Sequence, residues 1–195
     1  MKLIFATNNE HKVVEVRSVV GSLFEILTLK ETGIDIDIPE PYDTLEENAR
    51  NKSQTIFELT KINCFSEDTG LFVDALNGEP GVKSARYAGE DRLFEDNITK
   101  LLAKLSDNKN RKARFRTIIS LLLNGEEILF EGICEGTILV SNKGERGFGY
   151  DPIFVPEGST STFAEMSLEE KNKYSHRRKA MDKLIEFLKS ITNQD

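Results

Sequence analysis

The strongest constraint on the fold is a pair of long apolar runs joined by a tight-turn signal. Residues 113–123 and 127–140 both have the composition of β-strands, and the dipeptide Asn124-Gly125 stands between them. Asn-Gly between two such runs favours a two-residue β-hairpin, because both residues tolerate the positive φ angles of that turn. The sequence therefore predicts a long β-hairpin here.

Helical and strand patterns alternate on both sides of this hairpin. Thr44 and Glu47 form a capping-box pattern before an apolar stripe at helical spacing, which indicates the start of a helix. The chain has no internal repeat and no low-complexity linker, so we expect one mixed α/β domain over residues 1–195. The other predicted strands are residues 2–6, 24–29, 62–65 and 153–155, and the predicted helices are residues 9–20, 44–61, 91–105, 167–173 and 175–191.

The charge balance narrows the class of partner. The formal net charge is -7, with both signs spread along the chain, whereas nucleic-acid binders usually carry a basic domain or stripe. No stable nucleic-acid partner is therefore expected. An anionic small substrate is compatible with this balance, because a local cationic pocket and a divalent metal can override it.

The cysteines and the hydropathy bear on the cellular compartment. Cys64 and Cys134 lie in strand-like stretches without the number or spacing of a disulfide framework or zinc site, so we expect buried free thiols. The first apolar run ends before Thr7, too early for a signal peptide, and no later run reaches transmembrane length. We expect a cytoplasmic protein with no membrane partner.

The turn between the first strand and the first helix is unusually basic. A helix N-terminus favours acidic side chains because its dipole is positive, yet His11 and Lys12 stand there. Free backbone N–H groups, the amides of Asn8 and Asn9 and the Lys12 ammonium can together hold a phosphate without a Walker sequence. The alternative is that Asn9 is an ordinary N-cap and Lys12 is solvated.

A second basic helix start lies near the C-terminus, at the segment SHRRK of residues 175–179. Arginine gives planar, bidentate contacts to a phosphate or a carbonyl-bearing base, and His176 can donate or accept at either ring nitrogen. The alternative is a solvated basic patch paired with Glu169 and Glu170.

Carboxylates suggest a metal site. Glu47 stands on a predicted helix, and Glu67 and Asp68 follow a predicted strand at its carboxyl end, where ligands of open α/β sheets tend to bind. One or two carboxylates are enough to hold Mg²⁺ on a triphosphate. Each carboxylate taken alone is more often a cap or a surface charge.

An aromatic and glycine segment, FGYD at residues 148–151, has the composition of a base-binding loop. Glycine lets the backbone approach a ligand closely, an aromatic face can stack on a base, and the Asp151 carboxylate can accept N–H groups from a purine edge. The alternative is a tight turn with a core phenylalanine.

Taken in this order, these segments resemble the inosine triphosphate pyrophosphatase family over nearly the whole chain. The most specific matches are EDTGL at 67–71, PGVKSARYAG at 80–89, GFGYDPIF at 147–154 and SHR at 175–177. The resemblance implies an elongated, two-lobed α/β domain around a long mixed sheet, an active-site cleft between the lobes, and usually a homodimer.

The resemblance also implies roles for single residues. Asp68 corresponds to the general base and a Mg²⁺ ligand, Glu47 to the other metal carboxylate, and Lys52 to a triphosphate-binding lysine. The phosphate-binding turn corresponds to Thr7, Asn8, Asn9 and Lys12, the hydroxyl beside the base to Thr69, and the base-recognition set to Phe148, Gly149, Tyr150, Asp151, Lys171, His176 and Arg177.

Two positions depart from the family pattern. Many members have glycine at Asn8 and phenylalanine at Leu45, but asparagine tolerates a left-handed backbone well and neither change removes a charged group. The expected activity is Mg²⁺-dependent hydrolysis of inosine, deoxyinosine or xanthosine triphosphate to the monophosphate and pyrophosphate. The rival hypotheses are a pyrimidine-directed pyrophosphatase and a nucleotide-sensing or RNA-binding module without turnover.

Overall fold

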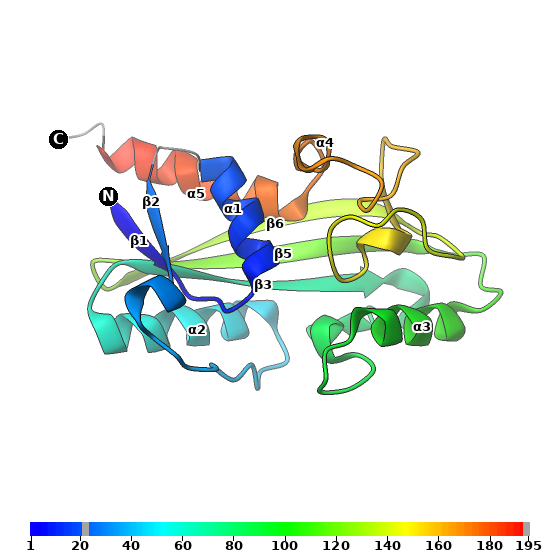
Figure 1. Ribbon diagram of the computed structural model, residues 1–195, viewed down its shortest axis with the longest axis horizontal. Coiled ribbons are helices and arrows are strands. Elements are labelled where there is room, and N and C mark those ends of the chain that lie inside the picture. Colours follow the sequence, from blue (N-terminus) through cyan, green and yellow to red (C-terminus); the bar gives the residue numbers. More distant parts are fainter. Residues whose placement is uncertain (21–23, 193–195) are drawn as a thin grey trace. The chain divides into compact units, whose positions relative to one another are not determined.

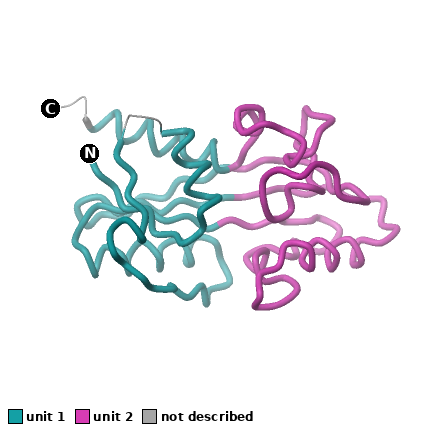
Figure 2. Tube along the Cα trace, in the orientation of Figure 1, with its two compact units in different colours: residues 1–68, 117–132, 177–195 teal, residues 69–116, 133–176 magenta. Residues whose placement is uncertain are grey.

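The computed structural model describes residues 1–20 and 24–192 of the chain (Figure 1). The chain divides into two compact units: residues 1–68, 117–132 and 177–195 form unit 1, and residues 69–116 and 133–176 form unit 2 (Figure 2). Each unit contains segments that are far apart in the sequence. That the two units act as one domain over residues 1–195 stays a prediction.

The sheet is mixed, as expected, with strand order β2-β1-β3-β5-β6-β7 and β4 paired to β3. β1 is parallel to β2 and β3, whereas β4 and β7 are antiparallel to their neighbours. At the predicted hairpin, Asn124 and Gly125 have φ angles of 54° and 89°. The strands are β1 (Lys2–Phe5), β2 (Glu25–Thr28), β3 (Cys64–Val73), β4 (Pro80–Gly81), β5 (Lys112–Leu123), β6 (Glu126–Ile138) and β7 (Phe154–Pro156).

Unit 1 packs helices on both faces of its strands (Figure 1). In β1, Leu3 and Phe5 join one apolar cluster with α1 and α5, while Ile4 joins another with α2, together with Ala6 directly after the strand. This alternation is the two-residue period of a strand that is buried on both faces. The helices are α1 (Glu10–Val20), α2 (Leu45–Thr60) and α5 (His176–Thr192).

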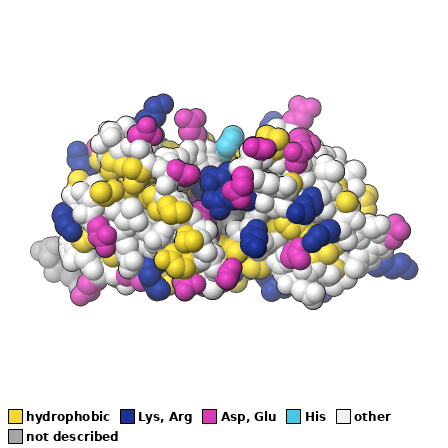
Figure 3. Space-filling view, turned by 90° about the horizontal axis from the view of Figure 1, so that it is seen from below, with side chains coloured by type: hydrophobic (Ala, Val, Ile, Leu, Met, Phe, Trp, Pro, Cys, Tyr) yellow, Lys and Arg dark blue, Asp and Glu magenta, His cyan; other side chains and the backbone are white. Residues whose placement is uncertain are grey.

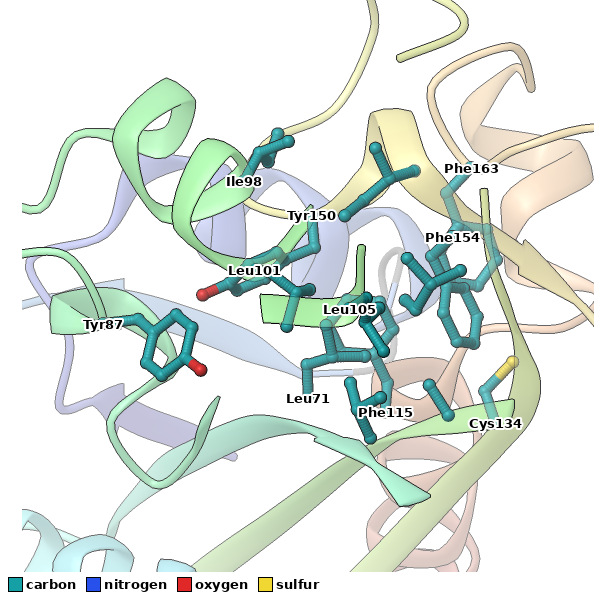
Figure 4. Packing of buried hydrophobic residues seen from close by; sticks show 14 of the residues in the cluster. Leu71, Tyr87, Ile98, Leu101, Leu105, Phe115, Cys134, Tyr150, Phe154 and Phe163 are labelled. Carbon is teal, nitrogen blue, oxygen red and sulfur yellow. The ribbon is translucent and has the colours of Figure 1, made fainter. Parts of the chain in front are cut away.

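Unit 2 is built around an aromatic core. Phe115 packs edge-on against Phe154 with ring centroids 4.7 Å apart, beside Leu71 and Leu101 (Figure 4). Large aromatic side chains bury much apolar area and so hold a small unit together. Its helices are α3 (Phe94–Leu105) and α4 (Leu168–Asn172); single-turn 3-10 helices of the chain are Lys30–Thr32, Asp74–Leu76, Ser84–Arg86 and Asp151–Ile153.

Two predicted boundaries were wrong for local reasons. The helix expected from residue 91 begins at Phe94, because Arg92 has a φ of 54° and Leu93 is extended. The strand expected at 62–65 continues to Val73, so Asp68 lies inside a ten-residue strand and not after its end. Both cysteines are free and buried, as predicted, and no helix among the described residues is long and apolar enough to cross a membrane.

Candidate active site

The predicted phosphate-binding turn of unit 1 is fixed by its own side chains. The Asn9 backbone N–H donates to Thr7 Oγ1 at 3.2 Å, and the side-chain Oδ1 of Asn9 accepts from the Lys12 backbone N–H at 3.2 Å. Asn8 Nδ2 donates to the Ile36 carbonyl at 2.8 Å. Asn9 therefore caps the first turn of α1, and the Lys12 side chain extends from that turn.

The Lys12 ammonium lies 3.0 Å from Oε1 of Glu67 on β3. Glu67 also accepts two hydrogen bonds from Arg177, at 2.6 Å from Nε and 2.8 Å from Nη2. Glu15 of α1 accepts from Nη1 of the same guanidinium. Burial raises the pKa of Glu67, but the charges of Arg177 and Lys12 outweigh it and hold that pKa well below its ordinary value.

A second charged cluster of unit 1 joins Lys52 with Asp68 and Glu40. Lys52 Nζ is 3.1 Å from Asp68 Oδ1 and 2.5 Å from Glu40 Oε1. Burial disfavours the charged form of Lys52, but the two carboxylates outweigh it and raise the pKa of Lys52. Burial, together with the Glu40 charge, also raises the pKa of Asp68 in spite of Lys52.

This second cluster fits a divalent cation. The Lys52 ammonium occupies the place between two carboxylates that suits a cation, and Asp68 Oδ2 is buried without a hydrogen-bond partner among the described residues. No group of three or more potential ligand side chains comes together in the described part of the chain. Two carboxylates with substrate oxygens and waters are the donor set that Mg²⁺ prefers over a closed protein cage.

Glu40, and not Glu47, is the glutamate that the structure brings to Asp68. Glu47 is exposed and caps α2: its backbone N–H donates to Thr44 Oγ1 at 3.2 Å, and its Oε2 accepts from that hydroxyl at 2.7 Å. Its capping role was visible in the sequence. Glu40 was missed because it stands between two prolines in a loop, where no periodic pattern distinguishes it.

Helix α2 holds the loop that carries Glu40. The Asn48 side chain makes two hydrogen bonds of 3.0 Å, accepting from the Tyr42 N–H and donating to the Tyr42 carbonyl. Asn51 Nδ2 donates to the Pro39 carbonyl at 2.9 Å. These residues and Lys52 are spaced at i, i+3 and i+4, so one helix face anchors the loop and contacts its carboxylate.

Unit 2 contains most of the predicted base-recognition residues. Asp151 Oδ2 accepts from Lys171 Nζ at 2.6 Å and from the Phe148 backbone N–H at 3.0 Å. The Lys171 ammonium lies 5.3 Å from the centroid of the Phe148 ring, within cation–π range. The loop and α4 therefore bring an aromatic ring, a carboxylate and an ammonium together.

Glycines shape this loop. Gly147 has a φ of 76°, and a Cβ there would lie 2.0 Å from Asp151 Oδ2, so only glycine allows the close approach. Gly149 has a φ of 61° with nothing within 4 Å of an added Cβ. Tyr150 is buried, and its hydroxyl donates to the Ser84 carbonyl at 2.9 Å. Burial raises the pKa of Tyr150, so its hydroxyl stays protonated and anchors the loop.

The predicted pair His176 and Arg177 divides between the units. His176 stacks on Phe115 in unit 2, with ring centroids 4.6 Å apart and an interplanar angle of 17°. Arg177 is 2% exposed and belongs to the charged cluster of unit 1 described above. Thr69 follows Asp68 in β3 and is half-buried in unit 2.

Charged side chains of both signs are spread over the face of the molecule in Figure 3, as the sequence suggested. The site residues instead form local sets. Unit 1 has a helix-start turn with a lysine and a carboxylate pair around a second lysine. These features, on an α/β fold, are those of proteins that bind phosphate groups and a divalent cation.

The chain belongs to the Ham1 family, whose model matches residues 3–187. It is 50% identical over 188 residues to the dITP/XTP pyrophosphatase of Flavobacterium johnsoniae, covering 96% of this chain and 98% of that protein. The Staphylococcus aureus Ham1 protein has a similar structure, with a TM-score of 0.88, 39% identity, and coverage of 97% and 99%. A Coxiella burnetii HAM1 protein gives a TM-score of 0.89 at 33% identity, with coverage of 97% and 99%.

Proposed function

We propose that this chain hydrolyses non-standard purine nucleoside triphosphates, namely inosine, deoxyinosine and xanthosine triphosphate, to the monophosphate and pyrophosphate. The observation that carries the proposal is the set of buried Asp68, buried Lys52 and half-buried Glu40. A carboxylate with one unpartnered oxygen, next to a lysine, suits water activation beside a polyphosphate. The name of the similar Flavobacterium johnsoniae protein, dITP/XTP pyrophosphatase, supports the same substrate class.

In the proposed reaction, a water oxygen attacks the α-phosphorus and the bond from that phosphorus to the bridging oxygen breaks. Asp68 Oδ2 orients the water and takes its proton, and pyrophosphate leaves with the bond electrons. Lys12 and Lys52 stabilise charge on the triphosphate, and the turn of Thr7, Asn8 and Asn9 orients it. Thr69 supplies a hydroxyl to the substrate.

The proposed metal is Mg²⁺, held by Asp68 and Glu40, with Glu47 as the sequence-based alternative. When bound, the metal would neutralise charge on the substrate phosphates. The two carboxylates both contact the Lys52 ammonium. Metal binding there would require this ammonium to turn toward the substrate, which is the role that the resemblance gives it.

The proposed base-recognition set is Phe148, Gly149, Tyr150, Asp151, Lys171, His176 and Arg177. Phe148 offers a ring for stacking, Lys171 a donor for a 6-oxo group, and Asp151 an acceptor for N1–H. Adenine presents the reverse pattern at these two atoms, so its triphosphate would leave buried groups unpaired. A homodimer and a cytoplasmic location stay predictions from the sequence, and light scattering in solution tests the dimer.

A triphosphate panel tests the proposal. Inosine, deoxyinosine, xanthosine, guanosine, adenosine and pyrimidine triphosphates are incubated with the protein, with and without Mg²⁺, and phosphorus NMR identifies the products. We expect pyrophosphate and monophosphate from the first three substrates, and only with metal. Orthophosphate as the first product would show that a different bond is cleaved. A preference for pyrimidines, or binding without turnover, would support one of the rival hypotheses.

A further inference from the structure

The charged cluster around Glu67 forms a row of alternating charges. Lys12 contacts Glu67, Glu67 contacts Arg177, Arg177 contacts Glu15, and Glu15 lies one helical turn after Lys12 on α1. Two carboxylates and two cations balance each other. This balance allows the row to be buried, because an uncompensated charge would be costly there.

Burial differs along the row. The side chains of Glu67, Arg177 and Glu15 are 0%, 2% and 9% exposed, and that of Lys12 is 15% exposed. Lys12 is therefore the member with most access to solvent and to a ligand. Its long stem has many rotamers, and the contact with Glu67 selects one of them.

We infer that Glu67 is a positioning residue, which fixes the Lys12 ammonium at the phosphate-binding turn without itself touching the substrate. This inference rests on the proposed function for its catalytic consequence. Two contacts then hold Lys12 at its two ends: Asn9 fixes the backbone N–H, and Glu67 fixes Nζ. Arg177 fixes the Glu67 carboxylate in turn, through a bidentate pair that leaves it little rotational freedom.

A double-mutant cycle separates positioning from a purely structural role. Glu67→Gln removes the charge that holds Lys12 and should lower kcat/KM for inosine triphosphate about tenfold or more, as expected for coupled neighbours. In a Lys12→Met background the same change should have little further effect on kcat/KM. If Glu67→Gln fails to fold, the double variant, whose net charge equals that of the wild type, is compared with Lys12→Met alone, and a large further loss of kcat/KM in the double variant would overturn the inference.

Glu15→Gln is the matched control, since it removes the same charge from the same row of charges but not from the partner of Lys12. It should destabilise the fold, and its effect on kcat/KM should be similar in both Lys12 backgrounds. The inference is overturned if Glu67→Gln lowers kcat/KM by the same factor with and without Lys12. It is also overturned if Glu67→Gln leaves kcat/KM unchanged.

Inorganic tripolyphosphate gives a readout that needs no turnover. It should raise the melting temperature of the wild type and of Glu15→Gln, because a ligand that binds the folded state stabilises it. The rise in melting temperature should be much smaller in Lys12→Met and in the double variant that combines Lys12→Met with Glu67→Gln. A wild type that binds tripolyphosphate but hydrolyses none of the nucleotides would refute the proposed function and leave this inference standing. No rise in the wild type would overturn the inference.

Discussion

Asp68 and Lys52 share a buried contact of 3.1 Å at Oδ1, while Oδ2 of Asp68 has no hydrogen-bond partner among the residues that the structure describes. An unpaired buried carboxylate oxygen is costly to keep. Such a cost is commonly found at functional sites, where a ligand or a reacting group supplies the missing partner. The most direct predictions therefore concern this carboxylate.

Asp68→Asn should lower kcat by about a hundredfold or more, since the amide can neither accept the proton nor bind the metal well. The melting temperature should stay close to that of the wild type, because two effects of the substitution on stability oppose each other. The pKa of Asp68 is raised, so its contribution to stability is present at low pH and is lost as pH rises through that pKa. At neutral pH the asparagine avoids the cost of burying the Asp68 charge, but Lys52 loses one of its two carboxylate partners.

Steady-state kinetics and thermal melts check this prediction. Asp182→Asn is the control, because its pair with Arg178 is exposed on α5 and contributes little to stability. An Asp68→Asn enzyme within a factor of a few of the wild type would remove Asp68 from its proposed role.

Glu40 and Glu47 give opposite predictions for metal dependence. Glu40→Gln should raise the Mg²⁺ concentration for half-maximal activity by about tenfold or more, because it weakens one of two carboxylate ligands. Glu47→Gln should leave that concentration unchanged and weaken only the cap of α2. Mg²⁺ titrations of both variants decide between them. A shift in Glu47→Gln alone would support the assignment made from the sequence.

Much of the fold could be predicted because its signals are local. Asn124-Gly125 encodes its turn in two residues, and Thr44 caps α2 through a contact three residues away. The start of α3 at Phe94 was missed because it depends on the left-handed backbone of Arg92. An arginine in the sequence does not signal that conformation.

The partners within the candidate site could not be predicted from spacing. Lys52 and Glu40 are 12 residues apart, through a loop whose path depends on the contacts of Asn48. Arg177 and Glu67 are 110 residues apart. Neighbouring positions can also differ, as His176 packs on an aromatic ring while Arg177 makes ion pairs. A sequence motif therefore identifies residues of a site but does not show which residues they contact.

Asn48 should affect metal dependence although it is not a proposed ligand. Asn48→Ala removes both hydrogen bonds to Tyr42 and frees the loop that carries Glu40. We expect a loss of about 1 to 3 kcal/mol in unfolding free energy for two hydrogen bonds, together with a higher half-saturating Mg²⁺ concentration.

Asn97→Ala is the matched control for Asn48→Ala. Asn97 is also buried and makes the same pair of contacts, with the Ala88 N–H at 2.7 Å and the Ala85 carbonyl at 3.0 Å, but in unit 2. It should lose similar stability in urea titrations while keeping the wild-type Mg²⁺ dependence. Equal Mg²⁺ dependence in both variants would mean that Asn48 only stabilises the fold.

Base recognition and phosphate recognition should be separable by mutation. Lys171→Met should lower kcat/KM for inosine triphosphate far more than for ATP, a loss of discrimination of about 1 to 3 kcal/mol for one charged hydrogen bond. Lys12→Met should lower both substrates by a similar factor, because a phosphate contact carries no information about the base. Arg177→Ala tests the same proposal less cleanly, since it leaves Glu67 and Glu15 without their cation. The measurement is kcat/KM for both triphosphates in each variant, with folding checked by circular dichroism. Equal losses for both substrates in Lys171→Met would assign Lys171 to the support of Asp151 and Phe148 and not to the reading of the base.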